Sequence, residues 1–201
     1  MIGQELEVKF YLQDLPRMEN RLVEAGAQLI QPRVFERNLR FDTLDGSLTR
    51  EQRVLRLRQD VRAHLTYKGP ADPQVAVSAR QEIEFGVDDF NAAQQLLEAL
   101  GYQVSVMYEK FRTTYHFQAT EVVLDEMPFG NFLEIEGPDA DTIRQAAIAL
   151  ELNWDGRCTD SYMSLFERLR RQGLEAAHLN FALLNGKTYT AADFGLQPGD
   201  C

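Results

Sequence analysis

The sequence predicts an α+β fold in which eight antiparallel strands close into a barrel, or tunnel, with a charged interior and helices packed outside. Three observations predict this fold. Most extended segments alternate charged and apolar residues with period two, so one face of each strand is charged and the other is apolar. The segments follow one another mostly in meander order, and eight strands are enough to close a barrel with a narrow interior. The helices between them are amphipathic and need an apolar surface to cover.

The opening segment sets the pattern for the first half of the chain. In Glu5–Lys9 the charged side chains share one strand face and the apolar side chains share the other. A helix follows, with Asp14 as its N-cap and Gly26 as its stop signal. Three further strands are predicted over residues 28–43, 54–58 and 63–68, with an Asp-Gly turn after the first of them.

The second half repeats this order of elements. A strand over residues 76–86 precedes a helix that is capped by Asp88 or Asp89 and ends at Gly101. Both halves open with a Glu-x-Glu strand motif, which indicates an internal duplication in topology more than in sequence. The remaining strands are predicted over residues 102–118, 122–125 and 132–136.

Two helices come after the last predicted strand. One covers about residues 141–150, and the other is capped by Asp160 and ends at Gly173. Their apolar stripes are expected to be core. We therefore predict one tunnel domain over residues 1–173 and an appendage over residues 174–201, whose role the sequence does not indicate.

Composition limits the classes of partner. The chain has 201 residues, of which 21 are basic and 31 acidic, so its net charge is -10. This charge argues against a nucleic-acid binder and against docking on an anionic membrane. The sequence has no apolar run of the ~20 residues that a transmembrane helix needs, no visible signal peptide, and too few cysteines for a disulfide framework. We expect a cytoplasmic monomer or homodimer with a small-molecule partner.

Two arrangements of the alternating strands fit the sequence. Either the charged faces meet bulk water and the apolar faces form a sandwich core, or the charged faces line a barrel whose apolar outside is covered by helices. The amphipathic helices favour the second arrangement. Because buried charges are costly unless they pair or bind ions, a charged interior would be a binding site rather than a stabilising device.

The predicted lining contains seven acids and seven bases. One or two Mg²⁺ or Mn²⁺ ions, which prefer hard oxygen ligands, would leave an excess of about +2 to +4, close to the charge that a triphosphate carries. The two Glu-x-Glu motifs on the first and last strands would meet where the barrel closes and form a metal corner, and the middle strands would form a phosphate wall. The acids are Glu5, Glu7, Glu82, Glu84, Asp125, Glu134 and Glu136, and the bases are Lys9, Arg56, Arg58, Lys68, Arg80, Lys110 and Arg112.

From about residue 5 to residue 166 the sequence resembles the CYTH superfamily, also called the triphosphate tunnel metalloenzymes. Glu-x-Glu-x-Lys alone is a weak motif, but the ordered set of motifs is specific. The motifs are Glu5-x-Glu7-x-Lys9, Phe41-Asp42-Thr43, Leu55-Arg56-Leu57-Arg58, Thr66-Tyr67-Lys68-Gly69, Arg80-Gln81-Glu82-Ile83-Glu84, Glu109-Lys110-Phe111-Arg112, Leu124-Asp125, Glu134-Ile135-Glu136-Gly137 and Ser161-Tyr162.

The resemblance implies an eight-stranded antiparallel tunnel and a role for each lining residue. It implies metal binding by Glu5, Glu7, Asp125, Glu134 and Glu136. It implies triphosphate binding by Lys9, Arg56, Arg58, Lys68, Arg80, Lys110 and Arg112. The residues expected to take part in catalysis are Glu5, Glu7, Lys9, Glu134 and Glu136, while Glu82 and Glu84 would serve either the metal or the orientation of the basic side chains.

Three functions remain open. The first is a divalent-metal-dependent hydrolase of tripolyphosphate, thiamine triphosphate or a nucleoside triphosphate. The second is a class IV-type adenylate cyclase, but the His-Phe pair that tends to precede the first motif in that branch is absent before Glu5. The third is a non-enzymatic binder of polyphosphate or nucleotides, which the seven acids disfavour. Arg40 stands where an aromatic residue often precedes Phe41, so the wall differs from the family pattern there.

Overall fold

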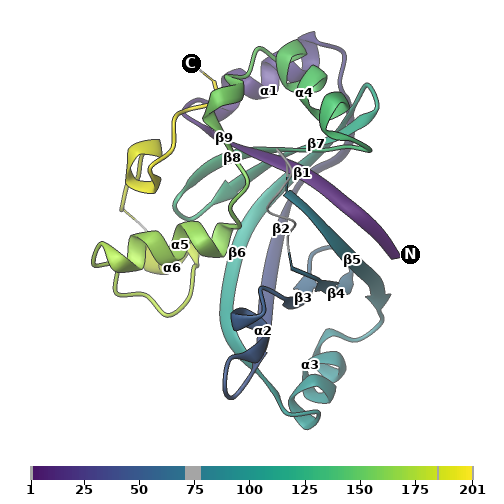
Figure 1. The fold of residues 1–201 in the computed structure, drawn as a ribbon, viewed down its shortest axis with the longest axis vertical. Helices are drawn as coiled ribbons and strands as arrows, with labels where there is room; N and C mark the ends of the chain where they lie inside the picture. Colours follow the sequence, from purple (N-terminus) through teal and green to yellow (C-terminus); the bar gives the residue numbers. More distant parts are fainter. Residues whose placement is uncertain (1, 71–77, 185, 201) are drawn as a thin grey trace.

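The computed structural model describes residues 2–70, 78–184 and 186–200, with side chains from Leu6 onward in the first strand. Eight antiparallel strands close into one ring in the order β5-β4-β3-β2-β6-β7-β8-β1, because β1 pairs with both β8 and β5 (Figure 1). The predicted α+β tunnel fold is confirmed. The strands are β1 (Ile2–Leu12), β2 (Gln28–Thr43), β3 (Val54–Gln59), β4 (Ala63–Lys68), β5 (Ser78–Val87), β6 (Tyr102–Phe117), β7 (Thr120–Met127) and β8 (Gly130–Glu136).

Helices cover the apolar outer face of the ring. α1 and α4 pack over β1, where Val8 and Phe10 are fully buried, and α3 packs through Leu97 over β2 and β3. Figure 1 shows these two sets of helices at opposite ends of the molecule. The apolar rows therefore face the helices, and the charged rows face inward, as predicted. The helices are α1 (Leu15–Glu24), α2 (Ser47–Arg50), α3 (Phe90–Ala99), α4 (Ala140–Ala149), α5 (Tyr162–Arg171) and α6 (Phe181–Leu184), with 3₁₀ turns η1 (Trp154–Gly156) and η2 (Ala191–Phe194) and a short strand β9 (Arg157–Cys158) on β1.

One end of the inner face is apolar rather than charged. Tyr11 and Phe132 lie opposite each other on β1 and β8, two residues beyond the opposed pair Lys9 and Glu134, so both pairs share the inner face. The Tyr11 and Phe132 rings pack edge to face, with their centroids 5.3 Å apart, and α5 adds Tyr162 to the same cluster. α5 therefore closes this end of the ring and leaves the remainder charged.

The C-terminal segment packs onto the same body. Leu179 exchanges two backbone hydrogen bonds of 2.9 Å with Met107 and Glu109 on β6. Near the end of the chain, the Asp200 carboxylate accepts hydrogen bonds from the backbone N–H groups of Gln13 and Asp14. The described part of residues 174–201 thus ties the end of β1 to the edge of β6, a role that the sequence did not indicate.

Several local predictions can be compared with the structure. Asp14 and Asp89 cap α1 and α3 through their side chains, but the N-cap of α5 is Ser161, so the prediction of Asp160 was wrong by one residue. Asp160 instead forms an ion pair with Arg168. Most strand bounds agree within two residues, and the start of the strand predicted over 76–86 lies outside the described residues.

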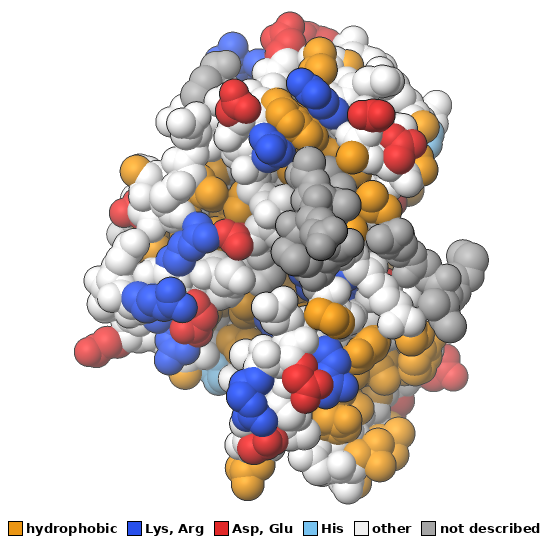
Figure 2. Space-filling model, in the orientation of Figure 1, with side chains coloured by type: hydrophobic (Ala, Val, Ile, Leu, Met, Phe, Trp, Pro, Cys, Tyr) orange, Lys and Arg blue, Asp and Glu red, His pale blue; other side chains and the backbone are white. Residues whose placement is uncertain are grey.

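The outer surface mixes residue types. On the face in Figure 2, acidic and basic side chains are interspersed, and hydrophobic side chains gather toward the end that carries α3. Phe85 and Leu96 are among the apolar side chains that remain more than half exposed. Of the helices that the structure describes, none has both the length and the apolar character required to cross a membrane.

Candidate active site

The charged inner face of the ring lines a cavity of about 380 Å³. Twelve of the fourteen side chains predicted to line the tunnel lie around this cavity. Of the other two, Glu5 has its side chain outside the described part of the structure, and Asp125 is fully buried behind the wall. The twelve are Glu7, Lys9, Arg56, Arg58, Lys68, Arg80, Glu82, Glu84, Lys110, Arg112, Glu134 and Glu136.

The two Glu-x-Glu motifs meet at the pairing of β1 with β8, as predicted. Lys9 lies opposite Glu134, and its Nζ is 2.9 Å from Glu134 Oε1 and 3.1 Å from Glu7 Oε1. Burial opposes ionisation of these carboxyls, but the neighbouring cations together outweigh burial and lower the pKa of both: Lys9 with Lys68 at Glu7, and Lys9 with Arg112 and Lys110 at Glu134. The corner therefore holds two ionised carboxylates around one ammonium.

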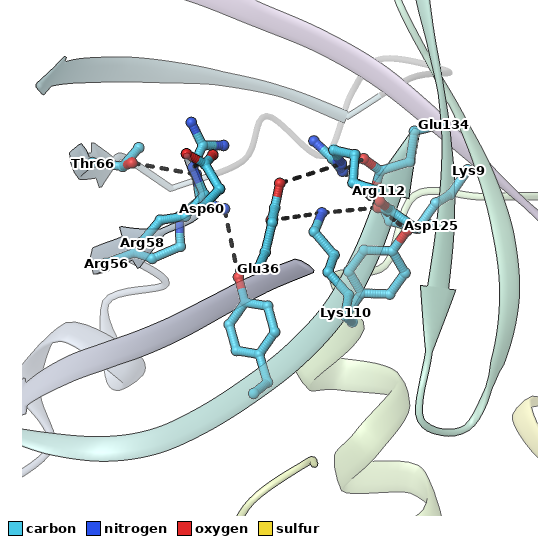
Figure 3. Close-up of polar contacts among 12 residues, drawn as sticks. Lys9, Glu36, Arg56, Arg58, Asp60, Thr66, Lys110, Arg112, Asp125 and Glu134 are labelled. Carbon is cyan, nitrogen blue, oxygen red and sulfur yellow. Dashed lines mark hydrogen bonds and ion pairs between the residues drawn. The ribbon is translucent and has the colours of Figure 1, made fainter. Parts of the chain in front are cut away.

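A second ionic cluster surrounds Asp125, beside this corner (Figure 3). Asp125 accepts hydrogen bonds from Arg112 at 2.7 and 2.5 Å, from Lys110 at 3.0 Å and from the Tyr162 hydroxyl at 2.8 Å. Arg112 also donates to Glu134 at 2.6 Å, so it joins the two clusters. Asp125 thus holds two cavity-lining cations in position. Its metal role stays a prediction.

Glu84 organises the arginines on the opposite wall. Its carboxylate accepts hydrogen bonds from Arg58 at 3.1 Å, from Arg56 at 3.4 Å and from the Thr66 hydroxyl at 2.6 Å. Thr66 comes from β4, which pairs with β5, and the two arginines come from β3, the next strand in the ring. The contacts of Glu84 favour the orienting role over the metal role. Glu82 lies 3.4 Å from Lys68 on the same wall.

Five further side chains at the site were given no role by sequence analysis, although Arg40 was noted as a departure in the wall and Tyr162 as part of a motif. Glu36 is buried on β2, 3.5 Å from the Lys110 ammonium. Burial raises its pKa, but the charges of Lys110, Arg112 and the two β3 arginines together outweigh burial and bring the pKa to about 2. Arg40 and Glu36 continue one inner row of β2, which the period of two could have identified. The four others line the cavity and are Arg40, Tyr108, Glu121 and Tyr162.

Three carboxylates stand in register across β1, β8 and β7. Glu136 lies opposite Glu7 on one side and opposite Glu121 on the other. Partial burial and the negative charges of Glu121 and Glu7 raise the pKa of Glu136 to about 7. Such oxygen donors suit Mg²⁺ and Mn²⁺. In the described part of the chain, no three acidic, histidine or cysteine side chains already form a metal-binding group. The suitability of these carboxylates for a divalent metal therefore rests on their oxygen donors and their negative charge.

This row predicts a pH-dependent stability. The pKa of Glu136 is raised in the folded protein above its ordinary value of 4.5, so the unfolded chain releases this proton first as the pH rises. The stability contributed by Glu136 is complete below that ordinary value and is lost as the pH approaches 7. In metal-free buffer with a chelator, we expect Glu136→Gln to reduce the fall in Tm between about pH 5 and about pH 8.

The matched control for this measurement is Glu24→Gln, on the exposed face of α1. It should follow the wild-type Tm profile. Parallel profiles for Glu136→Gln and the wild type would contradict the expectation.

Known proteins share this architecture. A sequence model described as the CYTH domain matches residues 3–168. A protein of Methanocaldococcus jannaschii named "Putative adenylate cyclase" is 26% identical over 172 residues, which cover 80% of this chain and 97% of that protein.

Solved structures with low sequence identity have the same fold. A Vibrio parahaemolyticus protein, also named as a "putative adenylate cyclase", superposes with a TM-score of 0.72 at 20% identity, covering 83% of this chain and 99% of that chain. HpAC1 from Hippeastrum, described as having a dominant triphosphatase activity, superposes with a TM-score of 0.64 at 20% identity, covering 86% and 98% of the two chains. At 20% sequence identity, these superpositions show a shared fold and nothing further.

Proposed function

We propose that this chain, which belongs to the CYTH domain family, is a divalent-metal-dependent hydrolase that releases phosphate from a triphosphate. Members of this family act on triphosphates. One observation carries the proposal. In the ring order, β2 and β3 stand across the cavity from β1 and β8, so a wall with Arg56 and Arg58 faces a wall with Glu7 and Glu136. A cavity with opposite charges on facing walls suits a phosphate chain held against metal ions.

The basic side chains would bind the phosphates. Arginine forks match phosphate oxygens bidentately, and lysine acts as a point charge. Arg112 and Lys110 are already held by Asp125, so they would meet the substrate with little loss of side-chain freedom. Their fixed positive charges would stabilise the negative charge that develops on the transferring phosphoryl group, which is the main task in this chemistry.

The carboxylates of the facing wall would hold the metal. Glu7, Glu134 and Glu136 are the residues that would bind Mg²⁺ or Mn²⁺, and Glu121 lies beside them on β7. A bound divalent ion supplies an attacking water of lowered pKa and polarises phosphoryl oxygens. Lys9, between Glu7 and Glu134, would keep these two carboxylates ionised and in place. The metal and its role are part of the proposal.

A second candidate function is a class IV-type adenylate cyclase, because all three of the similar proteins described above are named as putative adenylate or adenylyl cyclases. The same triphosphate-binding side chains would serve both reactions. In the cyclase, the ribose 3′-hydroxyl would replace water as the nucleophile. The cyclase further requires a pocket for adenine.

A substrate panel tests the two functions together. Purified protein is incubated with tripolyphosphate, thiamine triphosphate or ATP, with Mg²⁺, with Mn²⁺ or with EDTA, and both released phosphate and cyclic AMP are measured. We expect phosphate release that needs the metal. Cyclic AMP from ATP would favour the cyclase, and an absence of both products from every substrate would reject both functions.

A further inference from the structure

We propose that Arg40 forms an additional anion subsite that makes the cavity selective for inorganic polyphosphate chains over triphosphates that carry an organic group. The inference rests on the proposed function, since it names the substrate class of the same site. Arg40 lies on β2, lines the cavity, and stands directly opposite Arg56 on β3. Opposed residues on paired strands have Cβ atoms roughly 5 Å apart, so the two guanidinium groups share one small region of the wall.

Arg40 differs from the other cations of the cavity in its partners. Lys9, Arg56, Arg58, Lys68, Lys110 and Arg112 each form an ion pair with a carboxylate. Among the residues that the structure describes, the guanidinium groups of Arg40 and Arg80 form no ion pair and no side-chain hydrogen bond, and Arg80 Nε is buried without an acceptor.

The carboxylate nearest to Arg40 along its own strand is already engaged. Asp42 accepts hydrogen bonds from the backbone N–H groups of Leu48 and Thr49 at the start of α2, and from the Thr49 hydroxyl. These bonds use Asp42 to fix the turn after β2. Tyr108 also lies near Arg40, and its hydroxyl is 3.5 Å from Arg56 Nη1.

The surroundings of Arg40 are therefore positive. Burial, together with the charges of Arg56 and Arg80, lowers the pKa of Arg40, despite the opposing effects of Tyr108 and Asp42. Like charges placed directly opposite each other on paired strands destabilise a sheet, and a partly buried guanidinium without a partner adds a further cost. Such an arrangement is expected where an anion is bound, because the anion restores the balance.

The chemistry of the subsite distinguishes two kinds of triphosphate. Both ends of an inorganic chain carry a terminal phosphate with several unesterified oxygens, and guanidinium groups bind such oxygens as charged pairs. The α-phosphate of a nucleoside triphosphate has one oxygen taken by the ester, so it carries less charge and fewer acceptors. The proposal places Arg40, with Arg80 beside it, at the end of the site that the α-phosphate of a nucleoside triphosphate would occupy. There the two arginines would bind the free end of an inorganic chain more strongly than an esterified phosphate.

The test is Arg40→Gln, with Arg37→Gln as the matched control. Arg37 lies on the same strand, but it is exposed on the outer face and close to Phe90. We expect Arg40→Gln to lower kcat/KM for tripolyphosphate by about 10- to 100-fold, the effect of a lost charge-assisted contact, and kcat/KM for ATP by less than about threefold. Arg37→Gln should change neither value. Equal losses for the two substrates, or a larger loss for ATP through lost stacking on adenine, would overturn the inference.

Equilibrium titration calorimetry provides a readout that is independent of turnover. In the presence of EDTA, tripolyphosphate should bind Arg40→Gln about tenfold or more weakly than the wild type, while ATP binding should change less. If the wild type hydrolyses neither compound, the proposed hydrolase fails and the titration alone decides on Arg40. Unchanged tripolyphosphate binding would then reject the subsite. A Tm for Arg40→Gln at or above that of the wild type would show that the variant is folded.

Discussion

Replacing Glu7 and Glu136 together by glutamine should abolish metal-dependent turnover while leaving the protein folded. Both carboxylates line the cavity and lie opposite each other on β1 and β8. Glutamine keeps the shape of the side chain but removes the charge that a divalent ion needs. Since the metal supplies several kcal/mol of stabilisation in such reactions, we expect kcat/KM to fall by at least about 10³-fold.

Stability in EDTA should change much less than turnover. Removing the Glu136 charge relieves repulsion between facing carboxylates, whereas removing the Glu7 charge takes one of two carboxylate partners from Lys9, so these two effects oppose each other. Lys9 keeps Glu134 as its ion-pair partner at 2.9 Å. The wild type should gain Tm on addition of Mg²⁺ or Mn²⁺, and the double variant should not. The control is again Glu24→Gln, and turnover within about tenfold of the wild type would rule out these carboxylates as the metal site.

The period of two accounts for most of what the sequence predicted. It assigned Lys9, Arg58 and Glu134 to the charged strand faces, and it assigned Val8 and Leu57 to the apolar faces. In the ring, the charged faces line the cavity and the apolar faces are buried under the helices. Because amphipathic helices need an apolar surface, the same pattern also indicated which face lies inside. The order of the motifs along the chain then indicated which strands meet at the closure of the ring.

The pattern was used incompletely on β2. β2 and β6 pair with register shifts between Leu29 and Gln31, between Gln31 and Val34, and between Arg40 and Phe41. Between these shifts, residues 34 to 40 keep strict alternation, so Glu36 and Arg40 share the inner face. The charged Arg37 on the outer face obscures this division, and Glu36 was not predicted as part of the lining.

Contacts between distant parts of the chain have no periodic signature. The link between Asp200 and the backbone after β1 depends on a carboxylate at the far end of the chain. The burial of Asp125 likewise depends on α5, which brings Tyr162 over the inner face. Alternation assigns Asp125 to the inside of the ring, but Tyr162 of α5, together with Lys110 and Arg112, separates it from the cavity.

Asp125→Asn should lower the free energy of unfolding by about 3–5 kcal/mol, the cost of breaking a buried ionic cluster by removing one partner. Asp125 is fully buried and accepts hydrogen bonds from Arg112, Lys110 and Tyr162. Without its charge, the two cations would keep Glu36 and Glu134 as the carboxylates that pair with them in the described structure. Urea unfolding near pH 7 in EDTA measures the change.

The neighbouring residue on β7 provides the control for this measurement. Glu126 forms an ion pair with Arg33 at 2.6 Å, and both side chains are partly exposed, so Glu126→Gln should cost at most about 1 kcal/mol. A metal ligand at position 125 would behave differently from a residue that anchors cations. Asp125→Asn would then change the unfolding free energy in EDTA by no more than the control does, and it would lose the gain in Tm that Mg²⁺ produces. Because the anchor and the ligand lead to opposite results in EDTA, this one comparison decides whether Asp125 acts through Arg112 and Lys110 or through the metal.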